Sequence, residues 1–425
     1  MLIEFRVANY RSINEAQTLS LVAGPSKERL KENTFESGLP GFPRLLRSAV
    51  IYGANAAGKT NLLRALQYMQ TLVLRSATLQ AGARIVHMPF KLTKAASERK
   101  PSEFELVFAD EKGVRYEYGF SVDAERFCKE WLIAYPHGRP QNWFERTYDS
   151  KKKEYEWQFS TKLKGSPRVW RDATRGNALF LSTAIQLNSE QLRPVFQWFQ
   201  KKLVLIFGNE PGLPQLNPQL TYQMLEQPDG KRKLLQFVQA ADLGIDDLAM
   251  EKVPASGNVV AEANLAREPQ PASSMPTFIR ITSFHKVSET GSSIPLDLGE
   301  ESKGTQILFN SAGAWMNVLK NGEVILYDEL DTSLHPLMTR FLVRQFHGRT
   351  TNPKNAQLIF TTHDTSLLDS DLFRRDQVWF IEKDDKGASR VYPLTDFSPR
   401  KDEALERNYL RGRYGALPFI GELKL

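Results

Sequence analysis

The stretch VIYGANAAGKTNLLRAL, residues 50–66, sets a loop of small residues between an apolar strand and an amphipathic helix. Residues 53–60 match the pattern G-x-x-x-x-G-K-[ST] in full. In such a loop, backbone amides and the N-terminus of the following helix converge on phosphate groups. An incidental glycine turn is the alternative, but the strand before and the helix after make it a poor one. The stretch therefore predicts a nucleotide phosphate site.

The loop residues have separate predicted roles. Glycine is needed at Gly53 and Gly58 because a side chain there would block the approach of the phosphates. Lys59 would neutralise the β and γ phosphates, and the Thr60 hydroxyl would ligate Mg²⁺. The predicted cofactors are therefore ATP and Mg²⁺.

A pair of acids follows a second apolar strand in VILYDELDTSLHP, residues 324–336. We expect Asp328 to hold Mg²⁺, usually through water, and Glu329 to activate the attacking water as a general base. The alternative for this segment alone is an acidic turn at the end of a strand. Its occurrence in one chain with the glycine loop favours the catalytic interpretation.

Two further segments fit a phosphate site. LIFTTHDTSLL, residues 358–368, is an apolar strand that ends in His363, where a sensor of the γ-phosphate would lie. Ser302 and Gly304 precede an apolar helix, whose N-terminus could hold a phosphate. Taken alone, a structural histidine and a simple helix cap are the more common explanations.

Composition narrows the classes of protein. With 56 Lys and Arg against 49 Asp and Glu the net charge is +7, which permits contact with nucleic acid. A basic cluster at residues 151–175 is either a solvated charged hairpin or such a contact surface. The single cysteine, Cys128, favours a cytoplasmic location, and no segment has the roughly 18 consecutive apolar residues of a membrane helix.

The pattern of strands and helices suggests three parts. Residues 1–176 contain the phosphate loop and alternating β segments, including a hairpin around residues 110–113. Residues 177–274 form the second part: helical spacing continues to about residue 248, and a Pro-, Ala- and Ser-rich stretch at 253–276, best taken as a flexible loop, spans its end. Residues 275–425 begin with a predicted strand at 277–287 and then contain three further strand-like segments, with helical material between the first two of these, as in a parallel sheet.

The order of these motifs resembles the ABC-type ATPase head of the SMC, RecF and OLD proteins. VANYRSI at residues 7–13 is similar to the opening of that group, and GANAAGKTN is similar to its version of the loop. The likeness is greatest to stand-alone AAA-type ATP-binding proteins of the RloA and AbiL abortive-infection type. These share PFKL at 89–92, EWLIAYP at 130–136 and YLRGRYGALP at 409–418.

The resemblance implies an α/β P-loop NTPase fold: an ABC-ATPase head with a mixed β-sheet, an antiparallel β subdomain and an inserted helical lobe. Residues 1–176 and 275–425 would be the two halves of the head. It also assigns site residues: Asn55 and Asn61 in the loop, Ser302 and Gly304 in the signature element, Asp331 in the D-loop and His363 as the switch histidine. In such heads the signature of one subunit covers the γ-phosphate held by another, which implies a homodimer or higher homo-oligomer.

The sequence departs from the family pattern in three places. The signature reads ESKGTQ at residues 301–306 in place of a double glycine, and Gln141 is only a candidate for the Q-loop glutamine. FIEKDDKGAS at 380–389 contains Glu382, Asp384 and Asp385, but the residues after it are too few for the nuclease domain of OLD proteins. A strand and hairpin are expected there, with a nuclease site as the lesser alternative.

Three functions are compatible with these observations. The resemblance favours an ATPase that acts as a sensor or regulator in bacterial anti-phage defence and controls a separately encoded, nuclease-like effector. The alternative is a RecF-like DNA-repair ATPase that binds duplex DNA through its basic face. A nuclease in its own right is the third hypothesis. None of the three requires a membrane.

Overall fold

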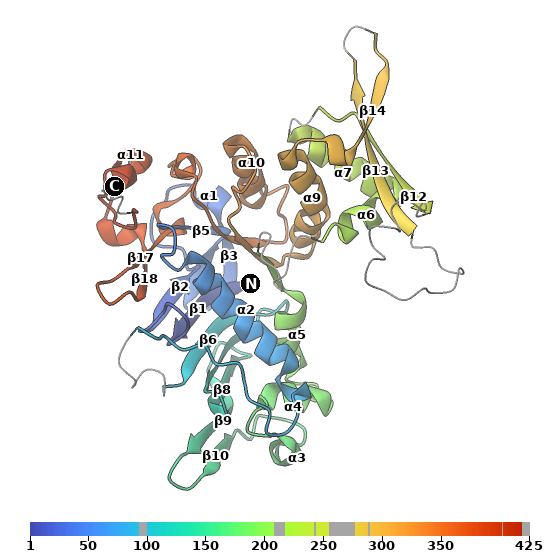
Figure 1. The fold of residues 1–425 in the computed structure, drawn as a ribbon. Helices are drawn as coiled ribbons and strands as arrows, with labels where there is room; N and C mark the ends of the chain where they lie inside the picture. Colours follow the sequence, from blue (N-terminus) through green and yellow to red (C-terminus); the bar gives the residue numbers. More distant parts are fainter. Residues whose placement is uncertain are drawn as a thin grey trace, which may run out of the picture. The chain divides into compact units, whose positions relative to one another are not determined.

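The computed structural model describes residues 1–92, 100–207, 217–241, 244–254, 277–287, 290–401 and 403–418. The chain divides into two compact units. Unit 1 consists of Met1–Pro214, Val318–Thr332 and Thr339–Leu425, and unit 2 of Gln215–Asn317 and Ser333–Met338. Figure 1 shows the elements of both units.

A six-stranded sheet in unit 1 has the order β11-β15-β16-β5-β17-β18. The strands are β5 (Ser48–Tyr52), β11 (Leu203–Phe207), β15 (Val324–Asp328), β16 (Gln357–Thr361), β17 (Val378–Lys383) and β18 (Ser389–Pro393). The first five run parallel, and β18 is antiparallel to β17. Every residue of β5, β15 and β16 is buried, as expected for central parallel strands.

A seven-stranded antiparallel sheet in unit 1 has the order β10-β9-β8-β7-β6-β1-β2. Its strands are β1 (Leu2–Ala8), β2 (Gln17–Ser20), β6 (Ser102–Ala109), β7 (Arg115–Val122), β8 (Phe127–Tyr135), β9 (Gln141–Asp149) and β10 (Glu154–Phe159). The predicted hairpin joins β6 to β7: the Asp110 carboxylate accepts the amides of Lys112 and Val114, and Gly113 has a φ of +76°. A two-stranded sheet, β3 (Thr34–Leu39) with β4 (Phe42–Leu46), follows α1 (Leu30–Asn33).

Helix α2 (Lys59–Arg75) is the central helix of unit 1 (Figure 1). Apolar residues at three- and four-residue spacing, such as Leu62, Leu66 and Met69, are buried along one side of it. It contacts β1 and β6 of the antiparallel sheet and β15 of the parallel sheet. The other helices of this unit are α3 (Pro167–Ala173), α4 (Phe180–Gln186), α5 (Arg193–Lys201), the later turns of α10 (Pro336–His347), and α11 (Leu405–Leu410).

Unit 2 contains helices and a small sheet. Its elements are α6 (Gln219–Leu225), α7 (Pro228–Ala240), β12 (Asp247–Pro254), β13 (Thr277–Lys286), β14 (Ser293–Asp297) and most of α9 (Lys303–Asn321). The strands form an antiparallel sheet in the order β12-β13-β14. The Thr221 hydroxyl of α6 accepts the Gly313 amide of α9 and donates to the Asn310 carbonyl, which joins the two helices.

The second unit does not coincide with the helical lobe expected at residues 177–274. Helices α4 and α5 and strand β11 belong to unit 1, because Glu130 of β8 accepts the first amides of α4 and β11 pairs with β15. Residues 247–254 form a strand because they pair with β13 along their whole length. The predicted flexible loop lies largely outside the described residues, which stop at 254 and resume at 277.

None of the helices in the described ranges is both long and apolar enough to cross a membrane.

Candidate phosphate-binding site

The strand order of the parallel sheet gathers the predicted site residues. β16 lies between β5 and β15, with Phe360 beside Val50 on one side and Tyr327 on the other. Because the three strands are parallel, their carboxyl ends meet at one edge of the sheet. The glycine loop follows β5, the acids end β15, and His363 follows β16. The three segments found in the sequence therefore converge.

The two loop glycines are required by close packing of the protein itself. A Cβ atom at Gly53 would lie 2.3 Å from the backbone oxygen of Ile381 in β17. Gly58 has a φ of +114°, and a Cβ there would lie 2.2 Å from the Ser389 hydroxyl oxygen. The room that these glycines leave for phosphate stays a prediction, and the structure adds a second reason for them, because β17 and β18 pack closely against the loop.

A serine pair supports the loop near Gly58. The Ser389 hydroxyl bonds the Ser12 hydroxyl at 2.8 Å and the Ala57 carbonyl at 2.5 Å. The Asn61 side-chain amide also donates to Ser12, at 2.9 Å. Asn61, predicted as a nucleotide contact, is thus engaged in holding the start of α2 against the N-terminal turn. Asn55 is exposed on the loop, and Thr60 is partly exposed at the start of α2.

The Lys59 ammonium is folded back over its own loop. Its Nζ donates to the Gly53 carbonyl at 2.8 Å and to the Ala54 carbonyl at 3.2 Å. Burial lowers the pKa of Lys59, while the carboxylates of Asp328 and Glu329 act in the opposite direction. The ammonium therefore bonds two carbonyls of its own loop and is subject to the charges of Asp328 and Glu329.

The two acids have different environments. Asp328 is buried, and its Oδ1 accepts a hydrogen bond of 2.6 Å from the Thr361 hydroxyl. Glu329 is exposed and has a φ of +54°, in the left-handed region that non-glycine residues rarely adopt. Thr332 donates to the Glu329 carboxylate at 3.3 Å. The two carboxylates thus differ in burial, which is compatible with the separate roles predicted for them.

Asp331 and His363 are joined at the same edge of the sheet. The His363 amide donates to Oδ2 of Asp331 at 3.1 Å. The other oxygen, Oδ1, is buried and has no hydrogen-bond partner among the described residues. Burial, and next the charge of Lys59, lower the pKa of His363, which favours the neutral ring. Asp331 therefore has an unused acceptor oxygen beside His363.

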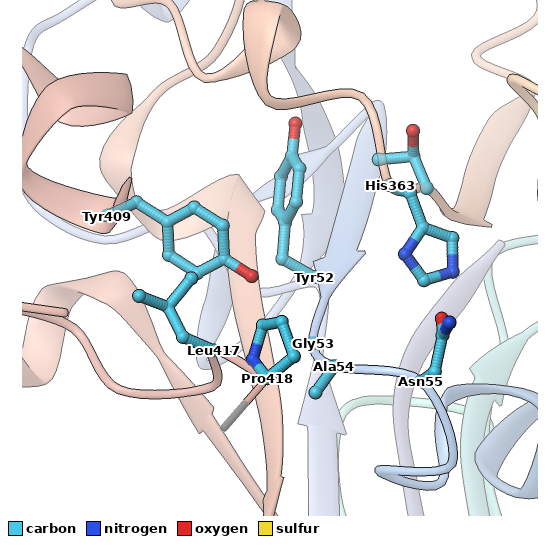
Figure 2. A pocket seen from close by; sticks show the side chains of 9 residues that line it. Tyr52, Gly53, Ala54, Asn55, His363, Tyr409, Leu417 and Pro418 are labelled. Atoms are coloured by element: carbon cyan, nitrogen blue, oxygen red, sulfur yellow. The ribbon is translucent and has the colours of Figure 1, made fainter. Parts of the chain in front are cut away.

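A cavity of about 220 Å³ opens beside the loop (Figure 2). It is lined by Tyr52, Gly53, Ala54, Asn55, Thr362, His363, Tyr409, Leu417 and Pro418. Figure 2 shows the His363 ring directed toward Asn55, with Tyr409, Leu417 and Pro418 on the opposite wall. Sequence reasoning noted the C-terminal YLRGRYGALP motif but assigned it no place in the site. The sequence signal for a role of this motif was that the ATP-binding proteins that the chain resembles share it.

The C-terminal wall is fixed by the acidic segment considered for a nuclease. Oε2 of Glu382 accepts the Ala416 amide at 3.0 Å, and the Tyr409 hydroxyl donates to the Ala416 carbonyl at 3.1 Å. Asp384 accepts the amides of Lys386 and Ala388 in the turn between β17 and β18. The expected strand and hairpin are confirmed, and Glu382 and Asp384 have structural partners.

The signature element belongs to unit 2, and the Q-loop candidate belongs to the antiparallel sheet of unit 1. In unit 2, the exposed Ser302 accepts the Thr305 amide at 3.1 Å and so caps α9. A Cβ at Gly304 would lie 3.0 Å from the Ser333 carbonyl. In unit 1, Gln141 begins β9 and its Oε1 accepts the Trp143 indole N–H at 3.2 Å. Nothing in these contacts identifies Gln141 as a ligand of the site.

The fold and the loop define a P-loop protein of the mixed α/β class, with a strand between the loop strand and the acid strand. The family model described as "AAA domain, putative AbiEii toxin, Type IV TA system" matches residues 48–369. The match covers more than half of the chain, so the protein belongs to this family of AAA domains.

Solved structures give a weaker likeness. "Structure of the recombination mediator protein RecF-ATP in RecFOR pathway" has a TM-score of 0.35 and 12% identity, covering 92% of this chain and 99% of the other. The RecF-ATPrS structure has a TM-score of 0.35 and 13% identity, with coverages of 92% and 98%. These scores are too low to support an argument. No curated protein matches the sequence.

Proposed function

We propose that the protein binds ATP with Mg²⁺ at the glycine loop and hydrolyses it to ADP and phosphate. The observation that carries this proposal is the position of β16 between β5 and β15, which gathers Lys59, Glu329 and His363 at one edge of the sheet. Membership of the AAA family supports it. The loop amides and Lys59 bind the phosphates, and Glu329 takes the proton of the attacking water.

The donors present fit a magnesium ion. The Thr60 hydroxyl and the Asp328 carboxylate are the hard oxygen ligands that Mg²⁺ prefers, and the cation usually completes its shell with phosphate oxygens and water. When bound, Mg²⁺ would neutralise charge on the phosphates. The neutral His363 ring, held next to Asp331, can donate one hydrogen bond toward the γ-phosphate.

Phosphate release by the purified protein tests this activity. We expect Mg²⁺-dependent release that stops when the metal is chelated and is lost in Asp328→Asn, because the neutral amide is a poorer ligand. The matched control is Asp385→Asn, which makes the same change at an exposed acid of the β17–β18 turn. Equal loss of phosphate release in both variants, or phosphate release that does not depend on Mg²⁺, would contradict the proposed site.

We further propose that two copies share each site, within a homodimer or a larger homo-oligomer. Ser302 is exposed at the start of the 19-residue helix α9, so its hydroxyl is accessible to a second chain. Together with Gly304 it would cover the γ-phosphate bound by the loop of the other copy, next to that copy's Asp331. This proposal rests on the resemblance to ABC-type heads and on the exposure of Ser302.

A mixing experiment tests the shared site. Ser302→Arg places bulk and charge on the covering surface, and Lys59→Ala removes the loop cation. A mixed dimer retains one site with Lys59 from one chain and Ser302 from the other. Phosphate release that is absent from each variant and recovers in the mixture supports sharing. Normal hydrolysis by monomeric Ser302→Arg protein contradicts it.

We propose that ATP-driven association makes the protein a sensor or regulator in bacterial anti-phage defence, acting on a separate, nuclease-like effector. This role rests on the resemblance to abortive-infection ATPases, and the family description, which names a putative toxin of a toxin–antitoxin system, fits a part in defence. Purification with and without the products of neighbouring genes, followed by mass measurement with ATP, tests it. A stable complex with a neighbour is expected. A protein that binds only duplex DNA, with an affinity that falls steeply with salt, would favour a repair role instead.

A further inference from the structure

We propose that Thr361 is a positioning residue that holds both acids of the site, an inference that rests on the proposed ATP hydrolysis. Thr361 is the last residue of β16 and is fully buried. Its backbone lies in register with Ile51 of β5, so it stands between the loop strand and the acid strand. In the sequence it is one more β-branched residue at the end of an apolar run.

The Thr361 hydroxyl makes two hydrogen bonds of opposite sense. It donates its single proton to Oδ1 of Asp328 at 2.6 Å and accepts the backbone amide of Glu329 at 2.7 Å. A hydroxyl has one proton to donate and two lone pairs that can accept. One threonine can therefore bond both acids by donating to the Asp328 carboxylate and accepting the Glu329 amide. The direction of the Asp328 carboxylate and the position of the Glu329 backbone are therefore fixed by the same oxygen atom.

The backbone of Glu329 needs such support. Its φ of +54° is unfavourable for a residue with a Cβ, and such conformations persist when surrounding contacts determine them. Two contacts from Thr361 flank it: the hydroxyl accepts the Glu329 amide, and the carbonyl accepts the Leu330 amide at 3.1 Å. The buried Leu330 side chain anchors the next position. The left-handed turn directs the Glu329 carboxylate outward, where it is exposed.

A fourth bond continues this connection. The His363 amide donates to Asp331, so four hydrogen bonds join residues 328–331 to residues 361–363. The metal ligand, the base and the switch histidine consequently form one hydrogen-bonded unit across two neighbouring strands. Thr361 provides three of these four bonds, and because it is fully buried we infer that it acts through the two acids.

Substitutions at Thr361 separate positioning from mere packing. Thr361→Val keeps the shape but leaves the buried Asp328 oxygen and the Glu329 amide without this partner. We expect kcat to fall about 10²-fold, as for small displacements of catalytic groups, with little change in ATP affinity measured by direct binding. Thr361→Ser keeps the hydroxyl and should restore most of kcat. The matched control is Thr339→Val, because the Thr339 hydroxyl is buried without a partner in the described part of the chain.

Hydrogen exchange supplies a readout that does not depend on hydrolysis. In Thr361→Val the amides of residues 328–331 should exchange faster than in wild type, and in Thr361→Ser they should not. If the wild type hydrolyses ATP but Thr361→Val does so equally fast, the positioning role is wrong and the proposed function stands. If the wild type releases no phosphate, the proposed function fails. Unchanged exchange in Thr361→Val then overturns the positioning of the acids as well.

Discussion

The ammonium of Lys59 donates a hydrogen bond of 2.8 Å to the carbonyl of Gly53. This bond joins the end of the glycine loop to its beginning. A second bond, to Ala54, holds the same ammonium. The two bonds keep the loop closed around the ammonium. Burial disfavours the charged form of Lys59, and the carboxylates of Asp328 and Glu329 favour it.

Removal of this cation should weaken nucleotide binding. In Lys59→Ala the loop loses the charge that would face the β and γ phosphates, and it also loses the hydrogen bonds from the ammonium to the Gly53 and Ala54 carbonyls. Hydrogen bonds to charged groups are worth about 1.5–3 kcal/mol, so we expect the Kd for ATP to rise roughly 10- to 10²-fold. Titration calorimetry measures this, with Lys386→Ala on the exposed β17–β18 turn as a control. An unaltered Kd would show that the loop does not hold the phosphates.

A buried ion pair away from the site should dominate the stability of unit 1. Arg146 of β9 and Glu130 of β8 are both fully buried and lie 2.9 Å apart. Glu130 also accepts the Phe180 and Leu181 amides at the start of α4. Glu130→Gln leaves the guanidinium without a counter-charge and should lower the free energy of unfolding by about 3–5 kcal/mol.

An exposed ion pair supplies the comparison. Lys152 and Glu156 lie 2.7 Å apart with more than half of each side chain exposed, and Glu156→Gln should cost less than about 1 kcal/mol. Denaturant unfolding measures both variants. Equal effects in the two would mean that the Arg146–Glu130 pair does not hold α4 against the sheet.

His347 should make stability depend on pH. Burial lowers the pKa of His347 to about 3, and its Nε2 bonds the Ser48 hydroxyl at 2.8 Å. The unfolded histidine titrates near 6.5, so between these values the unfolded state binds the extra proton. The contribution of the neutral, buried His347 to the free energy of unfolding is therefore present in full well above pH 6.5, and it is lost as the pH falls toward 3.

The histidine contribution can be isolated by substitution. Between pH 6.5 and pH 5 the wild type should lose about 1.6 kcal/mol relative to a His347→Gln variant, because the slope approaches about 1.4 kcal/mol per pH unit only once the unfolded histidine is fully protonated. Denaturant unfolding at the two pH values measures the difference. Parallel pH profiles for the two proteins would contradict a neutral, buried His347 in the folded state.

The site could be predicted where chemistry follows directly from local pattern. The loop at residues 53–60, the acids after β15 and His363 after β16 each end an apolar strand, and parallel strands bring such ends together. Thr361 could not be found this way, because its hydroxyl acts across strands while its sequence context is only apolar. Tyr409 and Leu417 reach the cavity through contacts with Glu382 and β17 that no short segment reveals.

The boundary between the units was also hidden from sequence. Helical spacing alone assigned residues 177–207 to a lobe, whereas a carboxylate of β8, about 50 positions earlier, fixes α4 in unit 1. Similarly, β12 is a strand through its pairing with β13, which lies beyond residues 255–276. Such long-range pairings override local propensity.

The nucleotide retained by Glu329→Gln tests the central claim most directly. The glutamine keeps the size of the side chain and removes the base. After incubation with ATP and Mg²⁺, we expect this variant to hold intact ATP with near wild-type affinity and to release phosphate about 10²- to 10⁴-fold more slowly. Recovery of ATP from the variant, under conditions where the wild type yields ADP, is the predicted result. ADP formation at the wild-type rate would contradict the assignment of Glu329 as the base and, with it, the proposed site.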